Sequence, residues 1–211
     1  MKPKIILSAA MSLDGRIGKD GERVKFSNEL DKKRVHEMRS TVDAVMVGIN
    51  TILIDNPKLT AHHSETKKNP MRIVVDSDAR TPLDSRVMNG EARTIIAVSQ
   101  GASENKVQNL QKKGAEVIKS GGTTVDLTLL IDKLHRRGIK TLLLEGGGTL
   151  NHSMLSLDLI DEIYLTIAPR ILGRGINLIN GALDKEILLK LEGITQLEDQ
   201  VVFHYIISKE K

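Results

Sequence analysis

Short apolar runs alternate with helix-like spacings along almost the whole chain. Runs of Ile, Leu, Val and Met predict strands over residues 4–10, 43–48, 71–75, 94–98, 117–118, 141–144 and 162–168. The spacing i, i+3, i+4, i+7 predicts a helix over 126–137 with an apolar face of Leu127, Leu130, Ile131 and Leu134. Caps and glycine stops predict further helices over 27–39, 51–53, 104–113 and 150–157. This alternation predicts an α/β fold with three layers around a mostly parallel central sheet.

The C-terminal segment has a different pattern. Residues 187–197 and 201–207 predict two strands joined near Asp199 and Gln200, which we expect to form an antiparallel edge on the parallel sheet. The polar stretch 62–69 is expected to be a surface loop. Because no repeat, low-complexity tract or linker interrupts the pattern, we expect one domain over residues 1–211.

Composition restricts the possible functions. Aromatic residues make up only 2% of the chain, too few for a base-stacking surface, and the net charge of +4 arises from basic residues interleaved with acidic ones. Nucleic acid is therefore not an expected partner. We expect no signal peptide and no membrane contact, because no apolar stretch approaches the roughly 20 residues of a membrane span. The absence of cysteine excludes disulfides and thiolate sites and suits a cytoplasmic protein.

Three consecutive glycines mark the most informative turn. Gly146–Gly148 follow the apolar run Leu142–Leu144 and precede Thr149 and Leu150, where a helix begins. Backbone N–H groups at a helix start have no intrahelical partner and bind phosphate or pyrophosphate. The alternative is a tight connection without a ligand, but three glycines exceed the needs of a plain turn.

Four other positions carry candidate chemistry. Thr51 and Asp55 lie four residues apart on a short predicted helix, so they share a face, although Asp55 could simply end that helix. Ser77 and Arg80 follow the third strand, and a hydroxyl with a guanidinium suits the 2′-phosphate of a dinucleotide.

Two charged residues and the histidines complete the candidates. Glu145 ends a buried strand and either forms a structural pair or meets a substrate. Arg39 ends the first long helix, where the helix dipole favours a cation in any case. The six histidines show no metal-ligand spacing, so we expect no metal site.

Five segments in this order resemble a known family. They are SLDGR at 12–16, VGINTILIDNPKLT at 47–60, RIVVDS at 72–77, LEGGGTL at 144–150, and 161–173 from DEIY to APRILG. The series is similar to the riboflavin-pathway reductases that act on diaminopyrimidine ribosylamino phosphates, whose fold resembles dihydrofolate reductase. Because no deaminase segment precedes it, the chain resembles the stand-alone archaeal and fungal type.

The resemblance implies a reaction and a set of residues. It implies hydride transfer from NADPH to C1′ of the ribosyl group of a phosphorylated pyrimidine, with use of NADH left open, and a homodimer. Its cofactor contacts carry over to Thr51, Asp55, Ser77 and the turn Gly146–Leu150, that is Gly146, Gly147, Gly148, Thr149 and Leu150; Arg80 is added by the 2′-phosphate argument.

Its substrate contacts carry over to Arg39, Leu59 and Glu145, with Ser27 and His62 expected near the 5′-phosphate. Asp55 and Glu145 are the expected catalytic residues, and Asp55 is the best candidate to assist proton movement. Many bacterial relatives have a lysine on the first strand where this chain has Ser8, so a lysine-assisted mechanism is not expected.

Two other functions remain compatible with the sequence. A dihydrofolate or pteridine reductase on the same fold would use a carboxylate on its first long helix, and that helix offers Asp31 and Glu37. A non-catalytic protein that binds phosphometabolites or nucleic acid is the third hypothesis, which the scarcity of aromatic residues disfavours.

Overall fold

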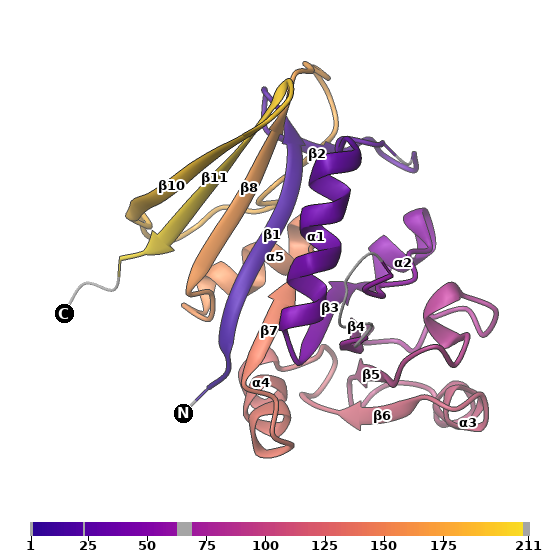
Figure 1. Cartoon of the computed structure of the whole chain (residues 1–211). Coiled ribbons are helices and arrows are strands. Elements are labelled where there is room, and N and C mark those ends of the chain that lie inside the picture. Colours follow the sequence, from indigo (N-terminus) through magenta and orange to yellow (C-terminus); the bar gives the residue numbers. More distant parts are fainter. Residues whose placement is uncertain (1, 23, 63–68, 209–211) are drawn as a thin grey trace.

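The computed structural model describes residues 2–22, 24–62 and 69–208. Within them, nine strands form one sheet in the order β10-β11-β8-β1-β7-β3-β4-β5-β6. In Figure 1 this sheet runs from β10 on the left to β6 at the lower right. The nine strands are β1 (Lys4–Ser12), β3 (Ala44–Gly48), β4 (Met71–Val75), β5 (Thr94–Val98), β6 (Glu116–Lys119), β7 (Thr141–Leu144), β8 (Glu162–Ala168), β10 (Leu189–Leu197) and β11 (Gln200–Ile207).

The helices cover both faces of the sheet. They are α1 (Glu29–Thr41), α2 (Ile49–Asp55), α3 (Glu104–Lys112), α4 (Leu127–Arg136), α5 (Gly148–Ser156) and the short 3₁₀ helix η1 (Arg86–Met88). Alternate side chains of each strand point to opposite faces. One buried cluster joins Met46 and Ile73 to α4 and α5, and the other joins Val45 and Val74 to α2 and α3. In Figure 1, α1 is drawn alongside β1, to its right.

The predicted architecture is confirmed. The strands from β8 to β6 are parallel, whereas β11 pairs antiparallel with β8 and with β10. Asn28 is the N-cap of α1, because its Oδ1 accepts the Asp31 N–H at 2.9 Å. The predicted surface loop 62–69 lies largely outside the described residues, since 63–68 are not among them.

Two short strands were not predicted. β2 (Arg16–Gly18) and β9 (Ile176–Asn177) pair antiparallel with each other in a separate ribbon. They have three and two residues, too few for a period-two pattern to be visible. The segment 12–18 therefore contains a strand, and its pairing places β9 beside this segment.

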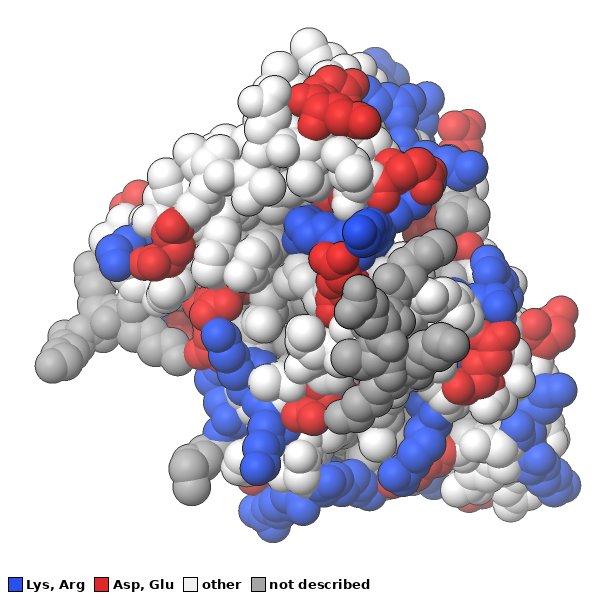
Figure 2. Space-filling model, in the orientation of Figure 1, with Lys and Arg blue, Asp and Glu red and all other residues white. Residues whose placement is uncertain are grey.

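The charged surface is mixed. In Figure 2 basic and acidic side chains alternate over the face shown, in line with the interleaving along the sequence. Among the helices that the structure describes, none combines the length and the apolar character needed to cross a membrane.

Two of the three glycines between β7 and α5 have backbone or packing reasons of their own. Gly146 has φ of +92°, a conformation that favours glycine, and its carbonyl accepts the Gly48 N–H at 2.8 Å. Gly148 meets β9 and the residues after it so closely that a Cβ would stand 2.3 Å from the Asn177 carbonyl oxygen. The glycine run is therefore partly a packing requirement, independent of any ligand.

Gly148→Ala is expected to lower the free energy of unfolding by about 1–3 kcal/mol, because the new Cβ overlaps backbone that cannot move aside freely. Urea denaturation measures the change. Gly122→Ala is the matched control: a Cβ there has no heavy atom within 4 Å. Equal free energies of unfolding for the two variants would contradict this, because they would show that the 176–180 segment moves aside with no loss of stability.

Candidate functional site

Two clefts meet at the carboxyl edge of the parallel strands. The first, here called the α5 cleft, has a volume of about 590 Å³ and lies between the start of α5, α2 and the loops after β4 and β6. The second, the α1 cleft, has a volume of about 480 Å³ and lies between α1, β1 and the segment 57–62. Both are lined by Ile17, Thr51, Asp55 and Gly147. A group bound in one cleft therefore lies next to a group bound in the other.

The α5 cleft has the features of an anion site. Gly147 is the N-cap of α5 and Gly148–Leu150 form its first turn, all of them lining the cleft. Their N–H groups precede the point where intrahelical hydrogen bonding begins, and the helix dipole adds positive potential there. Gly147 carries no side chain toward Thr51, whose Oγ1 lies 3.6 Å from where a Cβ would stand. The sequence-predicted turn thus does face a cleft.

Ser77 and Arg80 line the far part of the same cleft. The Ser77 Oγ accepts the Val125 N–H at 3.1 Å, which joins the loop after β4 to the loop before α4. The Arg80 side chain is 45% exposed, with its Nε 3.7 Å from Asp76 Oδ1 and 3.8 Å from Asp78 Oδ2. These are loose ion pairs, so the guanidinium is available to an anionic ligand.

A buried ion pair forms one wall of the α1 cleft. Arg39 donates from Nε to Glu145 Oε1 at 2.7 Å and from Nη2 to Oε2 at 2.6 Å. Its Nη1 donates to the Thr60 carbonyl at 3.1 Å. Burial lowers the pKa of the Arg39 guanidinium, but the Glu145 carboxylate more than offsets this, so the pKa lies above its ordinary value. The two-point contact with Arg39 therefore holds the Glu145 carboxylate in one orientation.

The same ion pair changes the expected role of Arg39. It was predicted to contact the substrate, and in the structure its guanidinium is paired with Glu145. These contacts use three of the five N–H donors of an arginine, so two remain for a ligand. Arg39 thus lies in the site as a residue that first positions Glu145.

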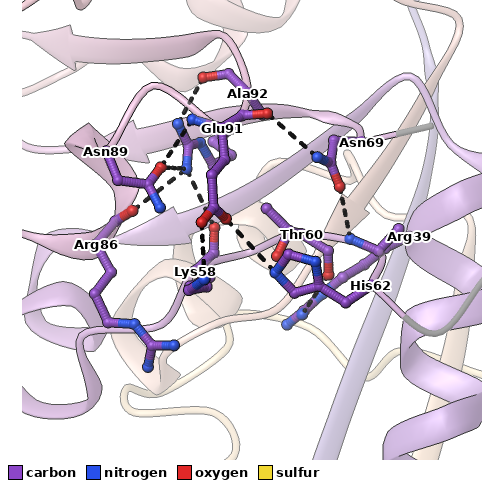
Figure 3. A network of polar contacts seen from close by, with 11 residues as sticks. Arg39, Lys58, Thr60, His62, Asn69, Arg86, Asn89, Glu91 and Ala92 are labelled. Carbon is purple, nitrogen blue, oxygen red and sulfur yellow. Dashed lines mark hydrogen bonds and ion pairs between the residues drawn. The ribbon is translucent and has the colours of Figure 1, made fainter. Parts of the chain in front are cut away.

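The segment 58–62 is held by a polar network (Figure 3). Glu91 accepts from Lys58 Nζ at 2.8 Å and lies 3.5 Å from His62 Nε2, while the Arg86 side chain points away from these residues. Beneath them Arg72 is fully buried and donates to Asn89 Oδ1 at 2.9 Å, the Ala92 carbonyl at 2.5 Å and other oxygens.

Burial lowers the pKa of the Arg72 guanidinium, which the nearby Glu91 offsets only in part. The buried cation is compensated by neutral oxygens from separate loops, which it holds together.

Most sequence-predicted residues reach the two clefts. The α5 cleft receives Thr51, Asp55, Ser77, Arg80, Gly147, Gly148, Thr149 and Leu150. The α1 cleft receives Ser27, Arg39, Thr51, Asp55, His62, Gly147 and Glu145, together with Ser8.

Two predicted residues line neither cleft. Gly146 is buried behind the turn. The Leu59 side chain is 1% exposed and packs in the apolar cluster of α2 and α3, and its backbone has a φ of +54°. Any contact from Leu59 is confined to its backbone.

Several lining residues were not predicted as site residues. Ile17 belongs to the unpredicted strand β2, and Thr124 and Val125 lie in a loop without a recognisable motif. Thr60 ends the motif segment 47–60 and Asn151 directly follows 144–150, so these two segments were a signal that could have pointed to them. Asp31 was noticed only as a carboxylate on the first helix.

Solved structures share this architecture over nearly the full chain. A pyrimidine reductase-like protein from Corynebacterium diphtheriae matches with a TM-score of 0.87 at 22% identity, covering 99% of this chain and 93% of that one. Acinetobacter baumannii RibD matches with a TM-score of 0.85 at 25% identity, covering 99% of this chain and 59% of that one. The fold is therefore the dihydrofolate-reductase-like fold of the pyrimidine reductases, and the class is that of the α/β oxidoreductases.

Sequence comparison gives the family. The model of the RibD C-terminal domain matches residues 3–203, and the chain belongs to this family. A Methanothermobacter thermautotrophicus protein named 2,5-diamino-6-ribosylamino-4(3H)-pyrimidinone 5′-phosphate reductase is 47% identical over 203 residues, 95% of this chain and 90% of the relative. A protein of the same name from Archaeoglobus fulgidus is 42% identical over 183 residues, 82% of this chain and 83% of the relative. The predicted family resemblance is confirmed, and a reductase of this family uses a nicotinamide cofactor.

Asp14 fastens the ribbon that borders the α5 cleft. Its carboxylate accepts from Ser12 Oγ at 2.6 Å, from the Leu172 N–H at 3.0 Å and from the Gly173 N–H at 2.7 Å. The Ser12 hydroxyl and these N–H groups lower the pKa of Asp14 from its ordinary 3.8 to about 2. The ribbon of β2 and β9 contributes Ile17 and Ile176 to the cleft.

Asp14→Asn is expected to lower the thermal midpoint near neutral pH. Because the folded-state pKa lies below the unfolded one, the ionised carboxylate stabilises the fold above about pH 4, and this contribution is lost as the pH falls toward 2. Thermal unfolding at several pH values should therefore show a difference between wild type and variant that shrinks below pH 4. The exposed Asp20 of the same segment gives the control, Asp20→Asn. A pH-independent difference would contradict this role.

Proposed function

We propose that this protein reduces the ribosyl group of 2,5-diamino-6-ribosylamino-4(3H)-pyrimidinone 5′-phosphate to the ribityl form in riboflavin biosynthesis, with NADPH as hydride donor. The observation that carries the proposal is the pair of clefts that share Thr51, Asp55 and Gly147. Relatives at 47% and 42% identity carry the name of this activity.

The α5 cleft fits a dinucleotide. Its glycine turn at a helix start suits the pyrophosphate, and Ser77 with Arg80 suits the 2′-phosphate that distinguishes NADPH from NADH. Thr51 and Asp55 line the end of the cleft next to the α1 cleft, where the nicotinamide is expected. The nicotinamide, when bound, supplies the hydride.

The α1 cleft fits the phosphorylated substrate. Ring opening of the ribosyl group gives an imine at C1′, which accepts the hydride on carbon while a proton reaches the nitrogen. Asp55 lies where both clefts meet and is our candidate to handle this proton.

Glu145, held in place by Arg39, accepts hydrogen bonds from the sugar hydroxyls and orients C1′. Ser27, His62 and the remaining donors of Arg39 are proposed for the 5′-phosphate, with Leu59 limited to its backbone.

A homodimer is proposed through the exposed sheet edge. The edge strand β10 presents Leu189, Leu191 and Ile194 with exposed fractions of 43%, 47% and 58%. Unpaired edges with apolar side chains are normally covered in a folded assembly. Sedimentation of the purified chain tests this.

The cytoplasmic location expected from the lack of cysteine stays a prediction.

Oxidation of NADPH, followed by its absorbance, tests the activity directly. Turnover is expected with the ribosylamino-pyrimidinone phosphate and not with dihydrofolate. Glu145→Ala is expected to lower kcat/KM by at least 100-fold, since it removes a sugar acceptor and leaves the Arg39 charge unpaired. Turnover of dihydrofolate alone would replace this function with that of a folate reductase. Undiminished turnover by Glu145→Ala would remove Glu145 from the site.

Arg80→Ala is expected to raise the KM for NADPH roughly 10-fold and to leave the KM for NADH unchanged. At a half-exposed site one charge-assisted hydrogen bond contributes about 1.5 kcal/mol, which is a factor of about ten. Arg93, 78% exposed and outside both clefts, gives the control Arg93→Ala. An equal rise in the KM for NADPH and the KM for NADH would place the 2′-phosphate away from Arg80.

A further inference from the structure

Three buried oxygens in the α1 cleft have no hydrogen-bond partner among the described residues. They are Asp31 Oδ2, Thr60 Oγ1 and Asn151 Oδ1. All three residues are 0% exposed and line the cleft from α1, the segment 57–62 and α5, respectively. Buried polar atoms are almost always paired in folded proteins, so three unpaired oxygens along one cleft require an explanation.

The surrounding contacts hold Asp31 and Asn151 in place. Asp31 Oδ1 accepts from Arg34 Nε at 2.9 Å, from Arg34 Nη2 at 2.8 Å and from Thr166 Oγ1 at 2.8 Å. Asn151 Nδ2 donates to the Leu178 carbonyl at 2.9 Å, which fixes the orientation of the amide. The unpaired oxygens are therefore the sides of these groups that the protein itself does not use.

The chemistry of these oxygens selects the ligand. The Asp31 carboxylate beside Arg34 and the Asn151 amide oxygen only accept hydrogen bonds, and the Thr60 hydroxyl can also donate one. A complementary ligand must bring several N–H or O–H donors into the cleft. An aminated pyrimidine with a ribosyl chain has such donors on its ring edge, its exocyclic amines and its sugar.

Asp31 differs from the other two groups because it is a carboxylate paired with an arginine, Arg34. Its Oδ1 is saturated by three donors, so it offers a ligand a single oxygen rather than a two-point contact. A single buried carboxylate oxygen accepts from an amino group and repels a carbonyl oxygen at the same position. It therefore distinguishes a 2-amino pyrimidinone from the 2-oxo compound that results from its deamination.

We propose that Asp31 Oδ2 accepts a hydrogen bond from the 2-amino group of the pyrimidine and thereby makes the enzyme selective for the aminated substrate over its 2-oxo counterpart. This inference rests on the proposed function, because it assigns the pyrimidine to the α1 cleft. Asp31 then acts in substrate selection, and the hydride transfer itself does not depend on it.

Asp31→Asn tests the proposal with the two substrates side by side. Wild type is expected to favour the 2-amino substrate by at least 100-fold in kcat/KM. The variant replaces one acceptor by an amide that also donates, so its KM for the 2-amino substrate should rise 10-fold or more, with kcat little changed. Its preference should fall to within 10-fold, because the new N–H serves the 2-oxo group.

Thr166→Val separates this role from a structural one. It removes a donor to Oδ1 and leaves Oδ2 untouched. The Thr166 variant is expected to keep the wild-type substrate ratio even if its thermal midpoint falls, since the ratio does not depend on the amount of folded enzyme. Loss of the preference in Thr166→Val as well, or retention of the wild-type ratio in Asp31→Asn, would overturn the proposal.

Failure of the proposed function is recognised separately. If wild type turns over neither pyrimidine, calorimetric titration of both compounds into wild type and Asp31→Asn decides the inference. If wild type binds the 2-amino compound selectively and the variant does not, the role of Asp31 in substrate selection is supported even without turnover. Equal binding of both compounds by wild type, or selectivity that persists in the variant, overturns it.

Discussion

The ion pair between Arg39 and Glu145 is the interaction on which the site depends. It joins the end of α1 to the end of β7, and through the Thr60 carbonyl it also fixes the segment that closes the α1 cleft. Both partners are largely buried, with side chains 13% exposed. A buried pair is stable only when its geometry is good and its remaining hydrogen bonds are satisfied, and the two-point contact meets this requirement. The acceptor presented to the substrate is therefore already formed.

The rest of the site is built from rigid parts around that pair. The parallel strands end at one edge, and their loops are fastened by polar side chains far from any reacting atom, such as Asp14 and Arg72. The glycine turn places α5 against the same edge and leaves space at Gly147. Preformed geometry of this kind suits a hydride transfer, which needs two groups held at close range more than it needs a strong acid or base.

The sequence was sufficient for the strands of the sheet, though not for their order, and for the residues with local signals. Apolar runs define the buried strands because both faces are covered, and Thr51 and Asp55 share a face through helix geometry alone. The contacts that could not be predicted join distant segments: Arg39 to Glu145, Asp14 to the 172–173 backbone, and β2 to β9. The positive φ of Leu59 and the burial of its side chain likewise leave no periodic signal in the sequence.

The common wall of the two clefts has a thermodynamic consequence. Ile17, Thr51, Asp55 and Gly147 line both cavities, so an occupant of one changes the surface offered to the other. Whatever factor the first ligand applies to the affinity of the second, the second applies to the first. The two binding constants of this enzyme are thus not separate properties of two sites. They belong to one thermodynamic cycle, because the two clefts share these four residues.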